Sequence, residues 1–214
     1  MECKICHQPT IPFYDKVMQS DFFHCTSCEF IFKDEDSYVT EERELAQYQN
    51  HNNSFESSGY VQMFRDFIDA TVAPHKQNIK TALEFGSGPG PVLSELLRQE
   101  GFEIDSYDKF FSPEKVYENK TYDLITSTEV IEHISDPLAL FSFFNTHLKP
   151  GGYLALMTQF HDNTQEGFLK WWYRKDPTHI TFYRPHTFEV LAERFDFDLR
   201  YVDDKKTALL QQKR

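Results

Sequence analysis

The sequence predicts an α/β fold: a doubly wound, mostly parallel sheet with a C-terminal antiparallel hairpin, preceded by a small cysteine-containing segment. From residue 81 onward, strand-like runs alternate with helical patterns, an order typical of a parallel sheet covered by helices. The last two strand-like runs are separated only by four polar residues, 203–206, which indicates a hairpin. All four cysteines fall within the first 28 residues, apart from this alternating region.

Each element follows from its local pattern. Residues 33–53 are charged and polar, and we expect a connector with one helix there. Pro74 ends a helical pattern at 59–73, and Gly101 and Gly151-Gly152 mark later helix ends. The further helices are expected at 91–100, 137–148 and 186–195, and the strands at 81–85, 102–107, 122–127, 153–160, 198–202 and 207–211. The chain is thus predicted to divide into a segment 1–35, a helical connector or substrate lid 36–78, and a sheet domain 79–214.

Length and charge bound the function. The 214 residues suit one ordinary domain with a small appendage, and 40% apolar residues suffice for a core. A formal net charge of −12 repels phosphate backbones, so a nucleic-acid partner is unlikely. No apolar run approaches ~18 residues and the N-terminus lacks a signal-like stretch, so we expect no membrane partner and a cytoplasmic location.

The cysteines form two identical pairs, Cys3-x-x-Cys6 and Cys25-x-x-Cys28. Two such pairs bring four thiolates around one ion, and a tetrahedral sulfur site suits zinc. The 18 intervening residues are too few for a core of their own, so metal binding would drive the folding of a ribbon. A closed shell of four cysteines favours structural zinc; free or redox-active thiols are the alternative.

Three of the eight glycines fall within Gly86-Ser87-Gly88-Pro89-Gly90, between a predicted strand and a predicted helix. Such a loop lets a ligand approach the backbone closely. A dinucleotide fingerprint requires a third glycine where Pro91 stands, and the lysine of a phosphate loop is absent.

The string Glu84-x-Gly86-x-Gly88-x-Gly90 instead resembles the first motif of class I S-adenosylmethionine-dependent methyltransferases. Residues 122–137 and 149–154 resemble the family's fourth-strand motif and its turn into the fifth strand. Residues 171–183 resemble a bacterial subgroup that carries an N-terminal CxxC…CxxC unit, so the likeness covers most of the chain. It implies a Rossmann-like methyltransferase domain with a small zinc ribbon, S-adenosylmethionine as cofactor and S-adenosylhomocysteine as product. Sugar C-methyltransferases also pair zinc with this fold, but they are longer and have an extra C-terminal domain, which we do not expect here.

The resemblance implies a set of cofactor residues. Asp108, at a strand end, would accept the ribose hydroxyls; a capping role is the alternative. Only 13 residues separate it from Tyr122, which leaves room for at most a stub of the family's third strand at 116–118, so Phe110 or Phe111 would stack on adenine. The implied cofactor residues are Glu84, Phe85, Gly86, Ser87, Gly88, Gly90, Asp108, Lys109, Thr128 and Glu129.

His133 and His179 are the candidate general bases, with Glu129 a weaker third. His133 follows Glu129 by four residues, so the two are expected to share a helical face and a hydrogen bond. Purely structural hydrogen bonding is the alternative for each histidine. The aromatic cluster at 171–173 forms either a substrate wall or a cover on the core.

The function predicted is methyl transfer to a small-molecule acceptor, with O- or C-methylation favoured. The alternative is a non-catalytic zinc-containing binding or assembly module with a vestigial cofactor site. Pro91 disfavours a dinucleotide oxidoreductase, and the negative charge disfavours a nucleic-acid methyltransferase. The acceptor half, assigned to residues 38–73 and 160–183, carries no motif that identifies the acceptor.

Overall fold

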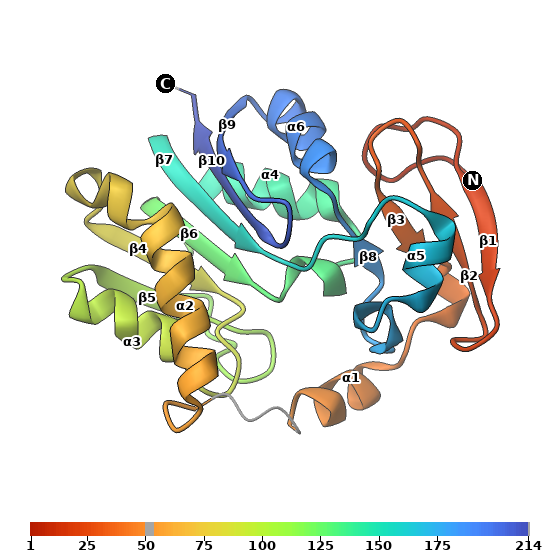
Figure 1. Cartoon of the computed structure of the whole chain (residues 1–214). Helices are drawn as coiled ribbons and strands as arrows, with labels where there is room; N and C mark the ends of the chain where they lie inside the picture. The colour runs from red at the N-terminus through yellow and green to blue at the C-terminus, as the bar shows by residue number, and fades with distance from the viewer. Residues whose placement is uncertain (50–53, 214) are drawn as a thin grey trace.

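The computed structural model describes residues 1–49 and 54–213; residues 50–53 of the predicted connector lie outside that part. Two sheets form the molecule, a large one of six strands and a small one beside it (Figure 1). The large sheet has the order β5-β4-β6-β7-β10-β9. Its strands are β4 (Thr81–Phe85), β5 (Glu103–Tyr107), β6 (Tyr122–Thr128), β7 (Leu148–Met157), β9 (Phe197–Val202) and β10 (Thr207–Gln212).

The predicted direction of the strands is confirmed. The neighbouring strands β5, β4, β6 and β7 are parallel to one another, and β10 is antiparallel to both β7 and β9. Within residues 109–121 the structure has no strand, so β5 forms the edge of the sheet. The strand predicted at 153–160 instead spans Leu148–Met157 and includes the glycine pair, because Leu148 already pairs with Tyr122 of β6.

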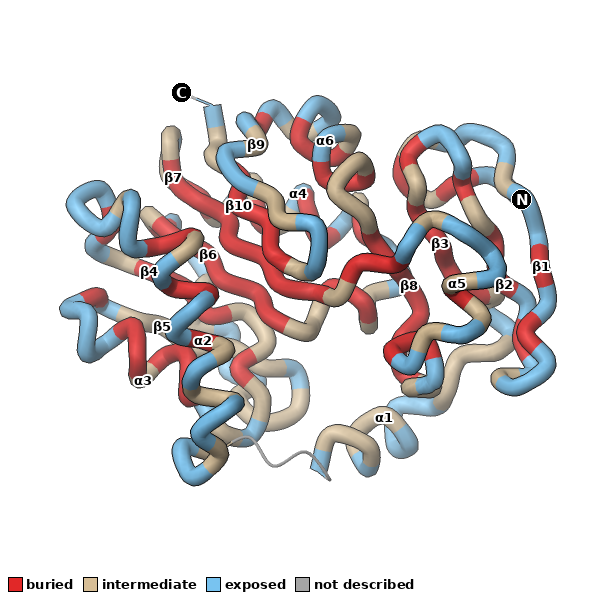
Figure 2. Tube along the Cα trace, in the orientation of Figure 1, coloured by how far each residue is buried: buried red, intermediate tan, exposed pale blue. Residues whose placement is uncertain are grey.

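Helices cover both faces of the large sheet (Figure 1). On one face α2 (Ser58–Thr71) and α3 (Val92–Gln99) pack over a shared cluster of apolar side chains, and on the other face α4 (Pro137–His147) and α6 (Pro185–Arg194) do the same. The Asp136 side chain caps α4 by accepting a hydrogen bond from the Ala139 amide. The central strands are buried along most of their length, as covering on both faces requires (Figure 2).

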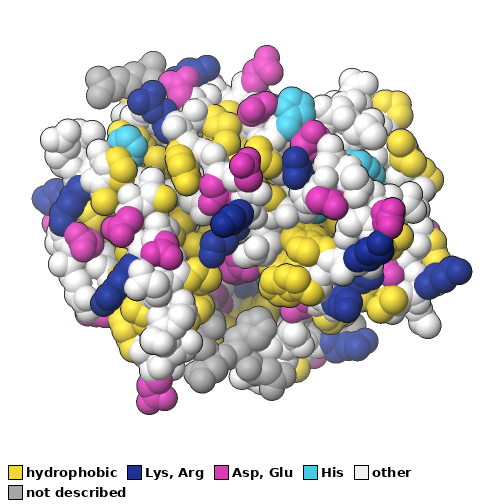
Figure 3. All heavy atoms as spheres, viewed as in Figure 1, with side chains coloured by type: hydrophobic (Ala, Val, Ile, Leu, Met, Phe, Trp, Pro, Cys, Tyr) yellow, Lys and Arg dark blue, Asp and Glu magenta, His cyan; other side chains and the backbone are white. Residues whose placement is uncertain are grey.

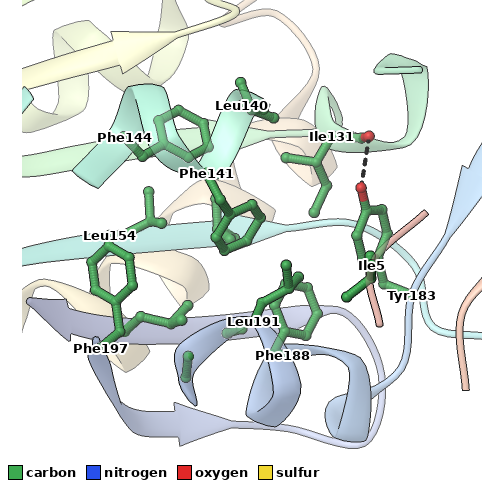
Figure 4. Packing of buried hydrophobic residues seen from close by; sticks show 14 of the residues in the cluster. Ile5, Ile131, Leu140, Phe141, Phe144, Leu154, Tyr183, Phe188, Leu191 and Phe197 are labelled. Atoms are coloured by element: carbon green, nitrogen blue, oxygen red, sulfur yellow. Dashed lines mark hydrogen bonds between the residues drawn. The ribbon is translucent and has the colours of Figure 1, made fainter. Parts of the chain in front are cut away.

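The small sheet has the order β1-β2-β3-β8. Its first three strands come from the N-terminal segment, and the fourth comes from a part of the chain about 150 residues further on, which the sequence did not predict. The strands are β1 (Ile11–Asp15), β2 (Ser20–His24), β3 (Ile31–Lys33) and β8 (Thr181–Phe182). Ile5 of the N-terminal segment and Tyr183 beside β8 also share one core with the α4 and α6 side of the large sheet (Figure 4).

Short helices complete the chain. The connector contains α1 (Glu41–Tyr48), as predicted, while α2 is one of the helices that cover the large sheet. The remaining helices are η1 (Glu35–Ser37), η2 (Ala73–Asn78), η3 (Ile131–His133), α5 (Gln165–Lys170) and η4 (Tyr173–Lys175). Among the described residues, every helix is too short or too polar to cross a membrane.

Candidate active site

A cavity of about 760 Å³ lies at the carboxyl ends of β4, β5 and β6, where open α/β sheets bind their ligands. The loops that follow these three strands form one side. Parts of α1 and α2 and the segment 172–179 form the rest. In Figure 1, α1 lies beneath the strand ends, at a distance from the sheet. The cavity therefore collects side chains from both halves of the sequence.

The glycine loop needs its glycines for conformation and for space. Gly86 and Gly88 have φ angles of +85° and +63°, which other residues rarely adopt. A Cβ atom on Gly86 would also overlap the side chain of Val130, which follows β6. The Gly88 amide donates to Asp108 Oδ2 at 2.8 Å, so the loop is tied to the end of β5.

Glu84 supports this loop from beneath. Its buried carboxyl accepts hydrogen bonds from the amide and the hydroxyl of Ser94, in the first turn of α3. Burial raises the pKa of Glu84 to about 7. Glu84 also lines the cavity, so one carboxyl contributes to both the fold and the pocket wall.

Asp108 is held firmly at the end of β5. Its Oδ1 accepts from the amides of Phe110 and Phe111, at 2.8 and 3.0 Å. Oδ2 accepts only from the Gly88 amide, so it retains a second lone pair for a ligand. Lys109 pairs with Glu41 of α1 at 2.9 Å and lies 4.8 Å from the centre of the Phe110 ring. All of the predicted cofactor residues except Gly90 line the cavity, and their roles stay predictions.

Two acidic side chains meet after β6, and one of them, Glu129, lines the cavity. Glu129 has a left-handed φ of +54°, and Glu132 is completely buried. The Tyr173 hydroxyl lies 3.0 Å from Glu129 Oε2 and also contacts Glu132 Oε1. One tyrosine proton can serve only one carboxylate, so the second contact requires a proton on one of the two carboxyls. Burial raises the pKa of Glu129 to about 7 and that of Glu132 well above its usual value, in accord with this geometry.

Both predicted histidines lie beside this pair. His133 Nδ1 is 3.0 Å from the carbonyl of Thr178, and His179 Nδ1 is 2.8 Å from the carbonyl of Tyr173. A carbonyl only accepts, so each Nδ1 carries the proton, and Nε2 is the acceptor nitrogen of the neutral ring. The two ring centres are 4.8 Å apart.

The expected hydrogen bond between Glu129 and His133 does not form. Residues 131–133 make a short 3-10 helix rather than a full α-helical turn, because the left-handed backbone at Glu129 breaks the helical spacing. The carboxyl near His133 is instead Glu132, whose Oε1 is 3.8 Å from Nε2.

The aromatic cluster at 171–173 serves both of the roles considered. Trp171 packs against a core cluster, whereas Trp172 is 66% exposed and lines the cavity. Tyr173 is buried and holds the two carboxyls. Chemical roles for Glu132 and the Tyr173 hydroxyl were not predicted from the sequence. The signal for Glu132 is an acidic residue placed among the apolar Val130, Ile131 and Ile134.

The four cysteine side chains come together away from this cavity. Cys3 Sγ is 3.5 Å from Cys28 Sγ, and Cys6 Sγ is 3.4 Å from Cys25 Sγ. All four sulfur atoms lie within 4.8 Å of one another, and none forms a disulfide. A tetrahedral zinc site with Zn–S bonds of about 2.3 Å has sulfur atoms just under 4 Å apart, so this donor set fits zinc closely. The residue after each pair, His7 or Glu29, has a left-handed φ near +60°, so the two pairs form matching turns.

Comparisons with known proteins give one consistent family. A family described as "Methyltransferase domain" matches residues 44–202. A ubiquinone biosynthesis O-methyltransferase of Colwellia psychrerythraea is 33% identical over 79 residues, which are 36% of this chain and 32% of that protein. A second such enzyme, from Paramagnetospirillum magneticum, is 31% identical over 94 residues, so the chain spans about a third of the length of the curated relatives it matches.

A solved structure supports the same fold. An O-methyltransferase family protein from Burkholderia thailandensis superposes with a TM-score of 0.55 at 10% identity, over 79% of this chain and 63% of that one.

Proposed function

The chain belongs to the methyltransferase-domain family, and from this we propose that it transfers a methyl group from S-adenosylmethionine to a small-molecule acceptor, at oxygen or carbon. One observation carries the proposal. A single cavity has the glycine loop and Asp108 on one wall, and a cluster of carboxyl and imidazole groups on another. Such an arrangement suits a donor and an acceptor held side by side.

The residues of the first wall fit the cofactor. Gly86 and Gly88 present backbone without side chains, and the remaining lone pair of Asp108 Oδ2 is available to a ribose hydroxyl. Phe110 or Phe111, both of which line the cavity, would stack on adenine, and the acidic side chains of the wall favour a cationic sulfonium. When bound, S-adenosylmethionine supplies a methyl group already activated by positive sulfur.

The second wall acts on the acceptor. The Nε2 atoms of His133 and His179 are positioned as acceptors for the proton of a hydroxyl or an acidic C–H group, worth about 10²–10⁴-fold in rate. Exclusion of water and alignment of the reactants contribute more, of order 7–11 kcal/mol. The curated relatives are O-methyltransferases by name, which favours oxygen as the acceptor atom.

In this proposal the cysteine site holds structural zinc, since four thiolates leave no open position for chemistry. Its segment supports the acceptor wall through β8, which leads from His179. A reducing cytoplasm suits this site, because the thiols there stay available to the metal.

Calorimetric titration of S-adenosylhomocysteine, with zinc measured on the same sample, tests the proposal first. We expect micromolar binding, about one zinc per chain, and about 10–100-fold weaker binding in Asp108→Ala. The exposed Asp66→Ala on α2 is the control. Methyl transfer from labelled S-adenosylmethionine is then measured on a panel of small hydroxylated acceptors. A folded, zinc-loaded protein that binds neither cofactor form would instead be the non-catalytic binding module.

A further inference from the structure

The cluster of Glu132, His133 and His179 has a geometry that hydrogen bonding alone does not require. One ligand atom from each of the three residues lies within 4.8 Å of the others. The residues come from two separate segments, η3 and the loop before β8. Two imidazoles and one carboxylate form a common ligand set for divalent transition metals, with positions left open for a substrate.

The orientation of the two rings supports this view. Each Nδ1 donates to a backbone carbonyl, of Thr178 or of Tyr173. Metal-binding histidines are usually fixed in this way through the other ring nitrogen, which directs the Nε2 lone pair at the ion. The Tyr173 hydroxyl contacts Glu132 Oε1, so the carboxylate is oriented as well.

Charge points in the same direction. Glu132 is completely buried, and its Oε2 has no hydrogen-bond partner among the described residues. Among the residues that the structure describes, neither Glu132 nor Glu129 forms an ion pair with a lysine or an arginine. A buried carboxylate is costly unless a cation or hydrogen bonds balance it.

We propose that Glu132, His133 and His179 bind one divalent first-row transition-metal ion, whose open positions take the acceptor's oxygen. The role of this ion rests on the proposed methyl transfer. The acceptor hydroxyl loses its proton to Glu129, which lines the same cavity. A C–O bond forms as the C–S bond of the sulfonium breaks, and the electron pair stays on sulfur. With the ion bound, His133 and His179 are ligands and Glu129 is the base; without it, the two Nε2 atoms are the proton acceptors described above.

Cobalt(II) tests the site directly. Protein that carries one equivalent of zinc, held by the four thiolates that bind it best, is titrated with Co²⁺ and followed by visible absorption. We expect one further equivalent with ligand-field bands and without sulfur-to-cobalt charge transfer. His179→Ala and Glu132→Gln should weaken cobalt binding by about 100-fold or more. His75→Ala, outside the cavity, is the matched control and should bind like the parent.

A circular dichroism spectrum and a melting temperature like those of the parent show that each variant is folded. The proposal is overturned if the zinc-loaded parent takes up no second equivalent, or if both ligand variants keep the parent's affinity. Binding of S-adenosylhomocysteine is measured on the same samples. Intact binding without cobalt uptake removes only the metal site, whereas loss of S-adenosylhomocysteine binding by the parent removes the proposed function.

Discussion

Glu84 is a residue whose ionisation affects the fold directly. Its pKa rises from 4.5 to about 7 through burial, while Arg98 lowers it and Asp108 raises it. The native state thus binds a proton more tightly than the unfolded chain, so stability from this group falls as pH rises from about 4.5 to about 7. In Glu84→Gln the side chain still accepts a hydrogen bond from Ser94 but does not titrate. We expect this variant to avoid about 3 kcal/mol of the decrease in unfolding free energy.

Urea unfolding at pH 5 and pH 8 measures this effect. The parent should lose more stability than Glu84→Gln between the two values, with unchanged m. Glu103→Gln is the control, because Glu103 is exposed on the neighbouring strand β5. Equal pH dependence in the parent and in Glu84→Gln would show that the buried carboxyl titrates normally.

Substitutions at Gly86 and Gly101 distinguish the cost of left-handed backbone strain from the cost of a steric overlap. Both have positive φ, but a Cβ would overlap Val130 at Gly86 and meets nothing within 4 Å at Gly101. We expect Gly101→Ala to cost about 1–2 kcal/mol of stability and to leave cofactor affinity unchanged. Gly86→Ala should also displace Val130 and the cavity wall, and so weaken S-adenosylhomocysteine binding more than tenfold. Calorimetry on both variants checks this, and equal affinities would contradict it.

At the scale of elements, local patterns were sufficient where the chain alternates regularly. The strand predicted at 81–85 is β4 residue for residue, and the C-terminal hairpin was found because a polar turn separates two apolar runs. The two residues of β8 carry no such period, and their pairing with β3 depends on contacts distant in sequence. The left-handed backbone at Glu129 could not be predicted either, since tertiary contacts fix this conformation.

One ion pair links the small sheet to the segment that holds the carboxyls. Arg174 Nη1 lies 3.0 Å from Asp15 Oδ2, off line for a hydrogen bond, and both side chains are 2% exposed. Arg174 directly follows Tyr173, so β1 anchors the residue that contacts both carboxyls. We expect Asp15→Asn to leave a buried charge unpaired, at about 3–5 kcal/mol. Turnover should therefore fall while affinity for S-adenosylhomocysteine persists.

Melting temperature, turnover and calorimetry on the same variants test this link. The double variant Asp15→Asn, Arg174→Met removes both charges and should recover most of the stability, because the stranded charge is gone. If Asp15→Asn reduced cofactor affinity as much as turnover, the ion pair would support the whole cavity rather than the acceptor wall.

At the scale of the molecule, the two sheets share material that the predicted boundary at residue 35 would separate. The buried cysteines, Ile5 and Phe30 belong to the same apolar cluster as α4 and α6 (Figure 4). The cluster beneath α2 and α3 is separate and contains none of these residues. On the face drawn in Figure 3, acidic and basic side chains of the described residues are interspersed. The sequence predicted the N-terminal segment and the sheet domain, but not that they share one core. Contacts between residues distant in sequence leave no local pattern.

This division predicts how loss of the proposed zinc ion would spread through the protein. Cys28→Ser removes one ligand of the four and weakens the cluster that the small sheet shares with α4 and α6. We expect hydrogen exchange to accelerate most in residues 1–33, next in 160–184 and least in β4, α3 and β5. S-adenosylhomocysteine binding should then survive within a few-fold, while turnover is lost.

Mass-spectrometric hydrogen exchange, with and without S-adenosylhomocysteine, measures how strongly exchange accelerates in each of these regions. Ser27→Ala is the control, because Ser27 lies in the same turn but is not a ligand. Uniform acceleration across the chain would mean that the two clusters unfold together, and that the metal holds the cofactor site as well. A graded acceleration of exchange would instead mean that the α2 and α3 cluster stabilises the cofactor half. The small sheet, with its proposed zinc site, would then keep only the acceptor wall in place.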